Sequence, residues 1–176
     1  ALLDLYEPGM RTARVERVFA ALAADLAGLI QAIADAPPLP EPPFAGATFP
    51  DALQWDLTLR MLADIGFDFD AGRQDRSAHP FTTTIALHDI RLTTRIDEAD
   101  PFSALASTLH EAGHGLYDQG FDPDYEDTPI AQAPSLGLHE SQSRLWENLV
   151  GRSLPFWRRY TPVMHEVFGA TMHGAS

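Results

Sequence analysis

Two histidines four residues apart, with a glutamate directly after the first, could perform a specific chemistry. They are His110, Glu111 and His114, in the pattern H-E-x-x-H. Residues four apart lie on one face of a helix, and two imidazoles so placed can hold one zinc ion, with Zn–N bonds of about 2.0–2.1 Å. Glu111 can then reach a water on the open side of the metal without being a ligand. The alternative is a chance match to the pattern on a solvated helix.

The residues around this pattern predict the helix that it needs. Pro101 suits the first helical turn, and Gly120 suits the helix end. Gly113 and Gly115 each weaken a helix by about 1 kcal/mol relative to alanine, but beside a metal they could let substrate or a neighbouring backbone approach closely. Apolar residues recur between these ends at helical spacing: Phe102, Leu105, Leu109, Leu116 and Tyr117.

A catalytic zinc takes three protein ligands and leaves one position for water. The extended pattern H-E-x-x-H-x-x-G-x-x-H fails here, so we expect the third ligand from a later helix, over residues 138–148. Glu140 and Glu147 are the candidates, and His139 is a weaker one. Arg144 lies four residues after Glu140 and could orient its carboxylate. An ordinary ion pair on the helix surface is the alternative.

Five short motifs occur in order over nearly the whole chain. HEAGHGLYDQG (110–120) and LGLHESQSRLWENLVGRS (136–153) follow a YEPG segment (6–9), an HPF segment (79–81) and a D-x-R-x-T segment (89–93). Together they resemble the carboxypeptidase Taq family of zinc metallocarboxypeptidases. This resemblance implies that His110, His114 and Glu140 are the metal ligands and that Glu111 is the catalytic carboxylate.

The resemblance also implies a fold and an activity. We expect a mainly α, helical zinc-peptidase architecture (H-E-x-x-H plus Glu), with a short antiparallel β segment near the active site. The implied enzyme is a zinc-dependent metallocarboxypeptidase that removes C-terminal residues from peptides, in which another divalent ion such as Co²⁺ could replace zinc. The alternatives are an inactive metal-binding module or scaffold, and a zinc endopeptidase or aminopeptidase.

Two motifs of the family, I-R-x-x-A-D and G-x-x-Q-D-x-H-W, do not occur in the sequence. The first is associated with an arginine that would bind the C-terminal carboxylate of the substrate. We therefore expect residues 1–176 to be a single region, the central part of a larger helical metallopeptidase domain. Alone, the chain should bind zinc but cleave peptides poorly, and it should form a homo-oligomer or associate with the missing segment.

Two further residues are candidates for substrate binding. His79 precedes Pro80, which favours an extended backbone, and it could point at the metal cleft; a buried structural histidine is the alternative. Arg91 could pair with a carboxylate in a bidentate way. An internal salt bridge to Asp89 or Asp97 is the slightly favoured alternative for Arg91.

The remaining elements are predicted from periodicity and from proline and glycine positions. We expect a helix over 12–34, a proline-rich connector at about 37–50, a helix from Pro50 to Gly66, a polar loop over 68–77, an antiparallel pair within 81–96 that turns near 88–89, a loop over 122–135 and a last helix over about 155–168. The β segment should form a wall of the cleft, where its edge could bind substrate as an added strand.

Composition excludes several classes of function. Cysteine is absent and all 12 basic residues are arginine, so disulfides, thiol chemistry and lysine Schiff bases are excluded. A net charge of −13 disfavours nucleic acid and anionic membranes as partners. We find no apolar run long enough to span a bilayer and no signal peptide, and we expect a cytoplasmic protein that acts on peptides.

Overall fold

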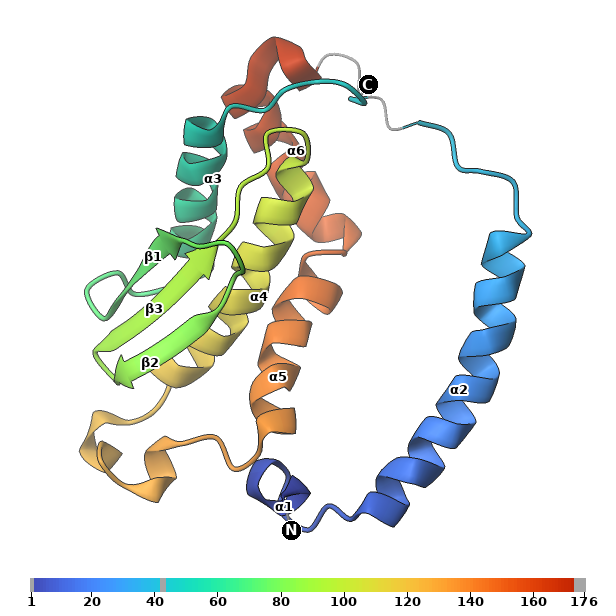
Figure 1. The fold of residues 1–176 in the computed structure, drawn as a ribbon. Helices are drawn as coiled ribbons and strands as arrows, with labels where there is room; N and C mark the ends of the chain where they lie inside the picture. Colours follow the sequence, from blue (N-terminus) through green and yellow to red (C-terminus); the bar gives the residue numbers. More distant parts are fainter. Residues whose placement is uncertain (1, 42–43, 173–176) are drawn as a thin grey trace. The chain divides into compact units, whose positions relative to one another are not determined.

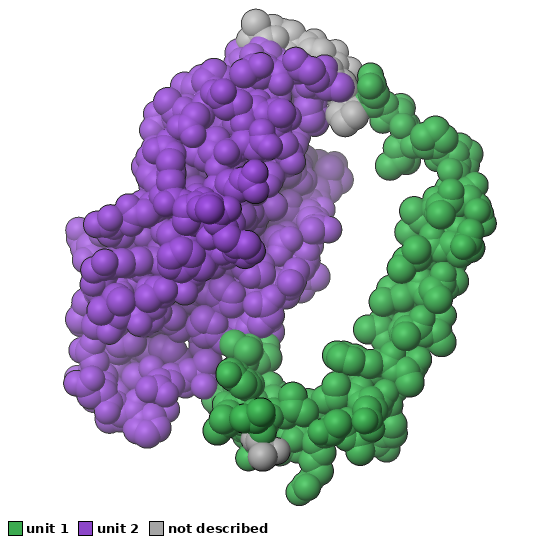
Figure 2. Space-filling model, in the orientation of Figure 1, with its two compact units in different colours: residues 1–42, 134–137 green, residues 43–133, 138–176 purple. Residues whose placement is uncertain are grey.

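The computed structural model describes residues 2–41 and 44–172, which form two compact units (Figure 2). Unit 1 comprises residues 1–42 and 134–137, and unit 2 comprises 43–133 and 138–176.

The chain is mainly helical with one small sheet, as predicted (Figure 1). Its α-helices are α1 (Leu3–Tyr6), α2 (Thr12–Ala34), α3 (Asp51–Asp64), α4 (Pro101–Gln119), α5 (Leu136–Arg144) and α6 (Leu154–Phe168). Its strands are β1 (Gly72–Arg76), β2 (Thr82–Ala86) and β3 (Asp89–Thr94). Short 3₁₀ turns are η1 (Pro123–Tyr125), η2 (Pro129–Ala131) and η4 (Gly169–Met172), and η3 (Leu145–Val150) is a π-helix.

Unit 1 consists mostly of α2, whose bounds agree with the predicted helix over 12–34. None of the residues of α2 is buried in the described structure. This helix is long and apolar enough to cross a membrane by length and composition alone, so the statement that the sequence holds no such run was wrong. Length and composition are weak evidence of a span, because a buried core helix of a soluble protein and a signal sequence near the N-terminus meet the same criteria.

The sheet of unit 2 has the strand order β1-β3-β2. Strands β2 and β3 pair antiparallel around a turn at residues 87–88, which confirms the predicted antiparallel pair. Strand β1 pairs parallel with β3, so the prediction of a polar loop over 68–77 was wrong there. The segment GRQDR carries no apolar alternation; its ladder with β3 supplies the backbone hydrogen bonds that make it a strand.

Helix α4 is central to unit 2. Asp100 caps its first turn, accepting hydrogen bonds from the backbone N–H groups of Phe102 (3.1 Å) and Ser103 (3.3 Å), and Pro101 follows directly. One face of α4 packs on the sheet through Ala112, which shares a buried cluster with Ile90 and Leu92 of β3. The sheet and the helices around α4 therefore fix the position of the helix that carries the H-E-x-x-H pattern.

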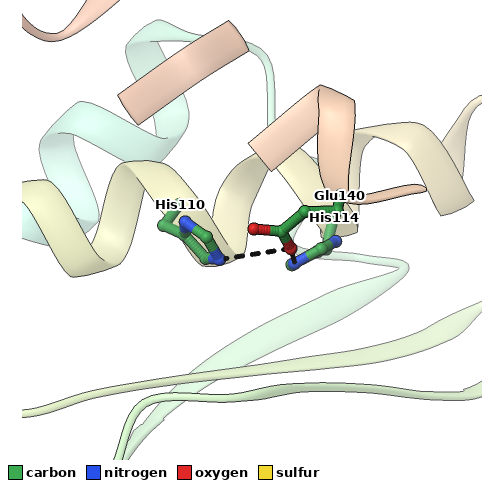
Figure 3. Close-up of side chains that lie close together, drawn as sticks. All are labelled: His110, His114 and Glu140. Carbon is green, nitrogen blue, oxygen red and sulfur yellow. Dashed lines mark ion pairs between the residues drawn. The ribbon is translucent and has the colours of Figure 1, made fainter. Parts of the chain in front are cut away.

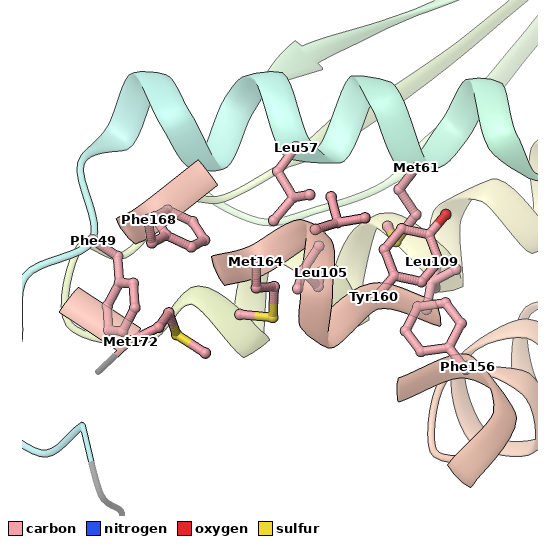
Figure 4. Close-up of a cluster of buried hydrophobic side chains, with 11 residues drawn as sticks. Phe49, Leu57, Met61, Leu105, Leu109, Phe156, Tyr160, Met164, Phe168 and Met172 are labelled. Carbon is pink, nitrogen blue, oxygen red and sulfur yellow. The ribbon is translucent and has the colours of Figure 1, made fainter. Parts of the chain in front are cut away.

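The larger core joins α4 to α3 and α6 (Figure 4). Its rings and aliphatic chains come from all three helices and from the segments that flank them: Phe49, Leu57, Met61, Leu105, Leu109, Phe156, Tyr160, Val163, Met164, Phe168 and Met172. Phe49 and Phe168 meet edge to face, with ring centroids 5.1 Å apart. Since Leu109 directly precedes His110, this core supports the first turn of the H-E-x-x-H pattern.

Truncating a side chain of this core should destabilise the fold. Leu57 is 1% exposed, so Leu57→Ala should lower the free energy of unfolding by about 2–5 kcal/mol through lost burial and the cavity left behind. Leu53, on the same helix but 37% exposed, provides the matched control, and Leu53→Ala should cost clearly less. Urea unfolding followed by circular dichroism measures both; equal losses would contradict this packing of α3.

Candidate metal centre

The side chains of His110, His114 and Glu140 converge at one point in unit 2 (Figure 3). One ligand atom from each lies within 4.8 Å of the others. Glu140 Oε2 is 3.4 Å from His114 Nε2 and 3.8 Å from His110 Nε2. Ligands arranged tetrahedrally at about 2.0 Å from one zinc ion lie about 3.3 Å from each other. The spacing therefore fits a shared divalent cation after a small contraction.

Glycine at position 113 allows α5 to lie against α4. A Cβ atom on Gly113 would stand 2.5 Å from the carbonyl oxygen of Gln142 and 2.5 Å from the Cα of Ser143. Real Cβ atoms do not approach backbone so closely, so any larger residue must push the two helices apart. We predicted that glycines in this pattern could let either substrate or a neighbouring backbone approach closely. At Gly113 the structure shows the close approach of a neighbouring backbone. That contact brings Glu140, on α5, to the two histidines of α4.

Glu140 and Glu147 are each held from the side away from the candidate centre. Arg144 Nε donates to Glu140 Oε1 at 2.9 Å, which leaves Oε2 for the centre. Glu147 lies in the π-helical turn η3 and accepts from His110 Nδ1 (2.9 Å), Arg144 (3.3 Å) and Arg152 (3.1 Å). The side chain of Glu147 thus meets the nitrogen of His110 that faces away from the cage.

These contacts determine which nitrogen and oxygen atoms present a lone pair to the candidate centre. Since Glu147 is a carboxylate, the proton of a neutral His110 ring lies on Nδ1, and Nε2 presents a lone pair. Burial raises the pKa of Glu140, but His110, Arg144, Ser143 and His114 outweigh it and hold that pKa below its usual value. A lone pair of His110 and an ionised carboxylate therefore face one another, an arrangement that a cation between them makes favourable.

Glu111 has a different environment from Glu140. It is 7% exposed, and its Oε2 accepts a hydrogen bond of 2.7 Å from the hydroxyl of Thr82 on β2. Burial raises the pKa of Glu111 above its usual value, although the Thr82 hydrogen bond and the charges of His110 and His79 partly offset this. A buried carboxylate with a raised pKa, beside candidate ligands, suits proton transfer near neutral pH.

His114 is the more enclosed of the two histidines. Burial, with the charges of His139 and His110, lowers the pKa of His114 to about 4, so its ring is neutral at neutral pH. Its Nδ1 lies 2.7 Å from Nδ1 of His139, and Nε2 of His139 lies 2.9 Å from Asp118 Oδ1. His139 was a weak ligand candidate. Thr82 lies outside the motifs, and Asp118 lies within the segment 110–120 but had no predicted role, so both were missed.

The two predicted substrate-binding residues lie in different surroundings. His79 is exposed, its Nδ1 donates to the Pro80 carbonyl (2.7 Å), and its charge is close enough to act on Glu111. Arg91 makes a bidentate ion pair with Asp89, at 2.6 and 2.7 Å. Its neighbours along β3, Ile90 and Leu92, are buried in the cluster with α4, so Arg91 projects from the other face of the sheet. The structure brings His79 toward the site and favours the internal ion pair for Arg91.

Comparison with known proteins decides the family. The family described as carboxypeptidase Taq (M32) metallopeptidase matches residues 1–176. The chain belongs to this family. Its members are metallocarboxypeptidases, and the resemblance drawn from the short motifs is confirmed.

Individual M32 relatives agree with this assignment. The chain is 47% identical over 171 residues to thermostable carboxypeptidase 1 of Thermus thermophilus. This match covers 97% of the chain and 33% of that relative. It is 39% identical over 166 residues to carboxypeptidase 1 of Bacillus subtilis, covering 94% of the chain and 33% of the relative. The crystal structure of an M32 carboxypeptidase from Deinococcus radiodurans R1 superposes with a TM-score of 0.90 at 45% identity, covering 98% of the chain and 34% of that structure. The chain thus spans about a third of the length of these M32 proteins.

Enlarging Gly113 should weaken the metal centre. Gly113→Ala forces α5 away from α4, so we expect zinc affinity to fall at least about 10-fold and stability to fall by about 1–3 kcal/mol. A Cβ atom on Gly28 in α2 would meet nothing within 4 Å, which makes Gly28→Ala the matched control, with unchanged zinc affinity. Competition with a chromophoric chelator measures the zinc affinity of both variants. Parent-like zinc binding by Gly113→Ala would refute this role of the close approach.

Proposed function

We propose that this chain provides the zinc-binding catalytic centre of an M32 carboxypeptidase, with His110, His114 and Glu140 as ligands and Glu111 as the catalytic base. The observation that carries the proposal is the convergence of these three donor groups beside a buried glutamate with a raised pKa. Two imidazoles and one carboxylate are a ligand set that catalytic zinc takes, with one position left open. Other divalent ions such as Co²⁺ could occupy the same donors.

The chain's own residues account for the proton transfers of peptide hydrolysis. Zinc, when bound, supplies a Lewis acid that polarises the scissile carbonyl and lowers the pKa of water. Glu111 accepts the proton of the attacking water and later delivers it to the leaving amine. The Thr82 hydroxyl engages Oε2 of Glu111, so Oε1 is the proton acceptor in this proposal. The raised pKa of Glu111, caused mainly by its burial, suits both steps because the carboxyl group must take and return a proton near neutral pH.

His79 is included as a substrate-binding residue. Its Nδ1 donates to the Pro80 carbonyl, so a hydrogen bond to the developing oxyanion would come from Nε2 of the protonated ring. Loss of one such donor typically costs about 100-fold in kcat. We therefore expect His79→Ala, which removes the donor, to lower kcat to that extent while the zinc content stays at the parent level. Arg91 is left out, because Asp89 already occupies its guanidinium group.

The direction of cleavage rests on membership of the M32 family. It is tested with two peptides of one sequence, one acetylated at its N-terminus and one amidated at its C-terminus, followed by mass spectrometry. A carboxypeptidase trims the acetylated peptide stepwise from its free C-terminus and leaves the amidated peptide intact. An aminopeptidase gives the reverse result, and an endopeptidase cuts both. Either of those results would overturn the proposal.

Two changes of glutamate to glutamine should fail in different ways. Glu111→Gln, made in a full-length context, should keep zinc and lose at least about 100-fold in kcat, because an amide cannot accept the proton of water. Glu140→Gln should lose zinc affinity strongly, because it removes an ionised ligand from the cage. Metal analysis and peptide assays on the same preparations measure both effects. Parent-like zinc content in Glu140→Gln, or activity within a few-fold of the parent in Glu111→Gln, would remove that residue from its role.

A further inference from the structure

Three residues behind His114 form a continuous series of polar contacts. Nδ1 of His114 lies 2.7 Å from Nδ1 of His139, and the two ring planes are nearly parallel, at 15°. Nε2 of His139 lies 2.9 Å from Asp118 Oδ1. The other carboxylate oxygen of Asp118 accepts a hydrogen bond from the Thr84 hydroxyl on β2. The series therefore runs from the candidate cage, through α5, back to α4 and on to the sheet.

The proton positions along this series follow from the chemistry of its members. Asp118 is an acceptor, so the single proton of a neutral His139 ring lies on Nε2, and Nδ1 of His139 carries a lone pair. Two ring nitrogens 2.7 Å apart need one proton between them, and it must therefore lie on Nδ1 of His114. Nε2 of His114 is then unprotonated, and this is the atom that faces Glu140 Oε2 at 3.4 Å.

We propose that Asp118 and His139 are positioning residues that hold His114 as the Nδ1–H tautomer, so that its Nε2 lone pair points into the metal cage before any ion arrives. Burial supports this, since the side chains of Asp118 and His139 are only 12% and 21% exposed and water competes little for their hydrogen bonds. His110 is held in the same tautomer directly by Glu147. His114 is held through a second imidazole, because Asp118 lies one turn further along the same helix.

The inference rests on the proposed function only for the identity of the ion, so its first test uses no metal. Nitrogen-15 NMR of the metal-free chain at about pH 8, where an unperturbed imidazole is neutral, reports which ring nitrogen carries the proton. We expect a protonated Nδ1 and an unprotonated Nε2 for His114, and the opposite pattern for His139. A proton on Nε2 of His114 would overturn the inference, whatever the chain does with peptides.

The second test measures zinc affinity by chelator competition in matched variants. His139→Leu keeps much of the volume but removes both hydrogen bonds, and we expect zinc to bind about 10–100-fold more weakly. His139→Gln can still accept from His114 and donate to Asp118, so it should bind zinc within a few-fold of the parent. His88→Leu, at an exposed histidine in the turn between β2 and β3, is the control and should leave affinity unchanged.

The outcomes separate this inference from the proposed function. Parent-like zinc affinity in His139→Leu, or an equal loss in His139→Leu and His139→Gln, would overturn the positioning role, because the hydrogen bonds would then not matter. If the parent chain bound no zinc but showed the expected tautomers, the proposed function would fail and the positioning of His114 would stand. Circular dichroism spectra of the variants, matching that of the parent, exclude loss of fold as the cause of weakened binding.

Discussion

The candidate centre depends on one close contact, the approach of the α5 backbone to α4 at Gly113. The two histidines come from α4 alone, at a spacing that any regular helix provides. The third candidate ligand, Glu140, comes from a later helix, and its carboxylate reaches the histidines because Gly113 has no side chain to hold the two helices apart. On the opposite face of α4, Gly115 similarly admits the side chains of Phe67 and of Leu92 on β3. The two glycines thus let α5 and the sheet pack closely against α4, the helix that holds both candidate histidines.

Charge organisation around the centre follows a common rule. The far side of each candidate ligand has a partner of its own: Glu147 for His110, His139 for His114 and Arg144 for Glu140. Each partner fixes a proton or an oxygen away from the cage, so the remaining lone pairs converge. Glu111, by contrast, is buried, and this burial raises its pKa although the hydrogen bond from Thr82 partly offsets the rise. Neighbouring carboxylates in different surroundings can therefore serve as ligand and as base.

Much of this site could be predicted from sequence, because H-E-x-x-H and the HES segment have fixed local spacing. The apolar residues at helical spacing around Glu140 are Leu138, Leu145 and Leu149, yet these residues are 41%, 39% and 69% exposed, and the buried contact is at Ser143. Strand β1 and the roles of Thr82 and Asp118 escaped prediction because they depend on contacts between distant segments. Thr82 stands outside the motifs, and although Asp118 lies within the segment 110–120, nothing in that pattern indicates a contact with a histidine on a later helix.

The central claim is that α4 and α5 together build one three-ligand cage, and diffraction from crystals soaked in zinc tests it most directly. Anomalous scattering recorded on both sides of the zinc absorption edge locates the ion independently of the protein coordinates. We predict one strong peak within about 2.0–2.2 Å of His110 Nε2, His114 Nε2 and a Glu140 carboxylate oxygen. A peak bound instead by Glu147 or His139, or no peak between the two helices, would contradict this claim.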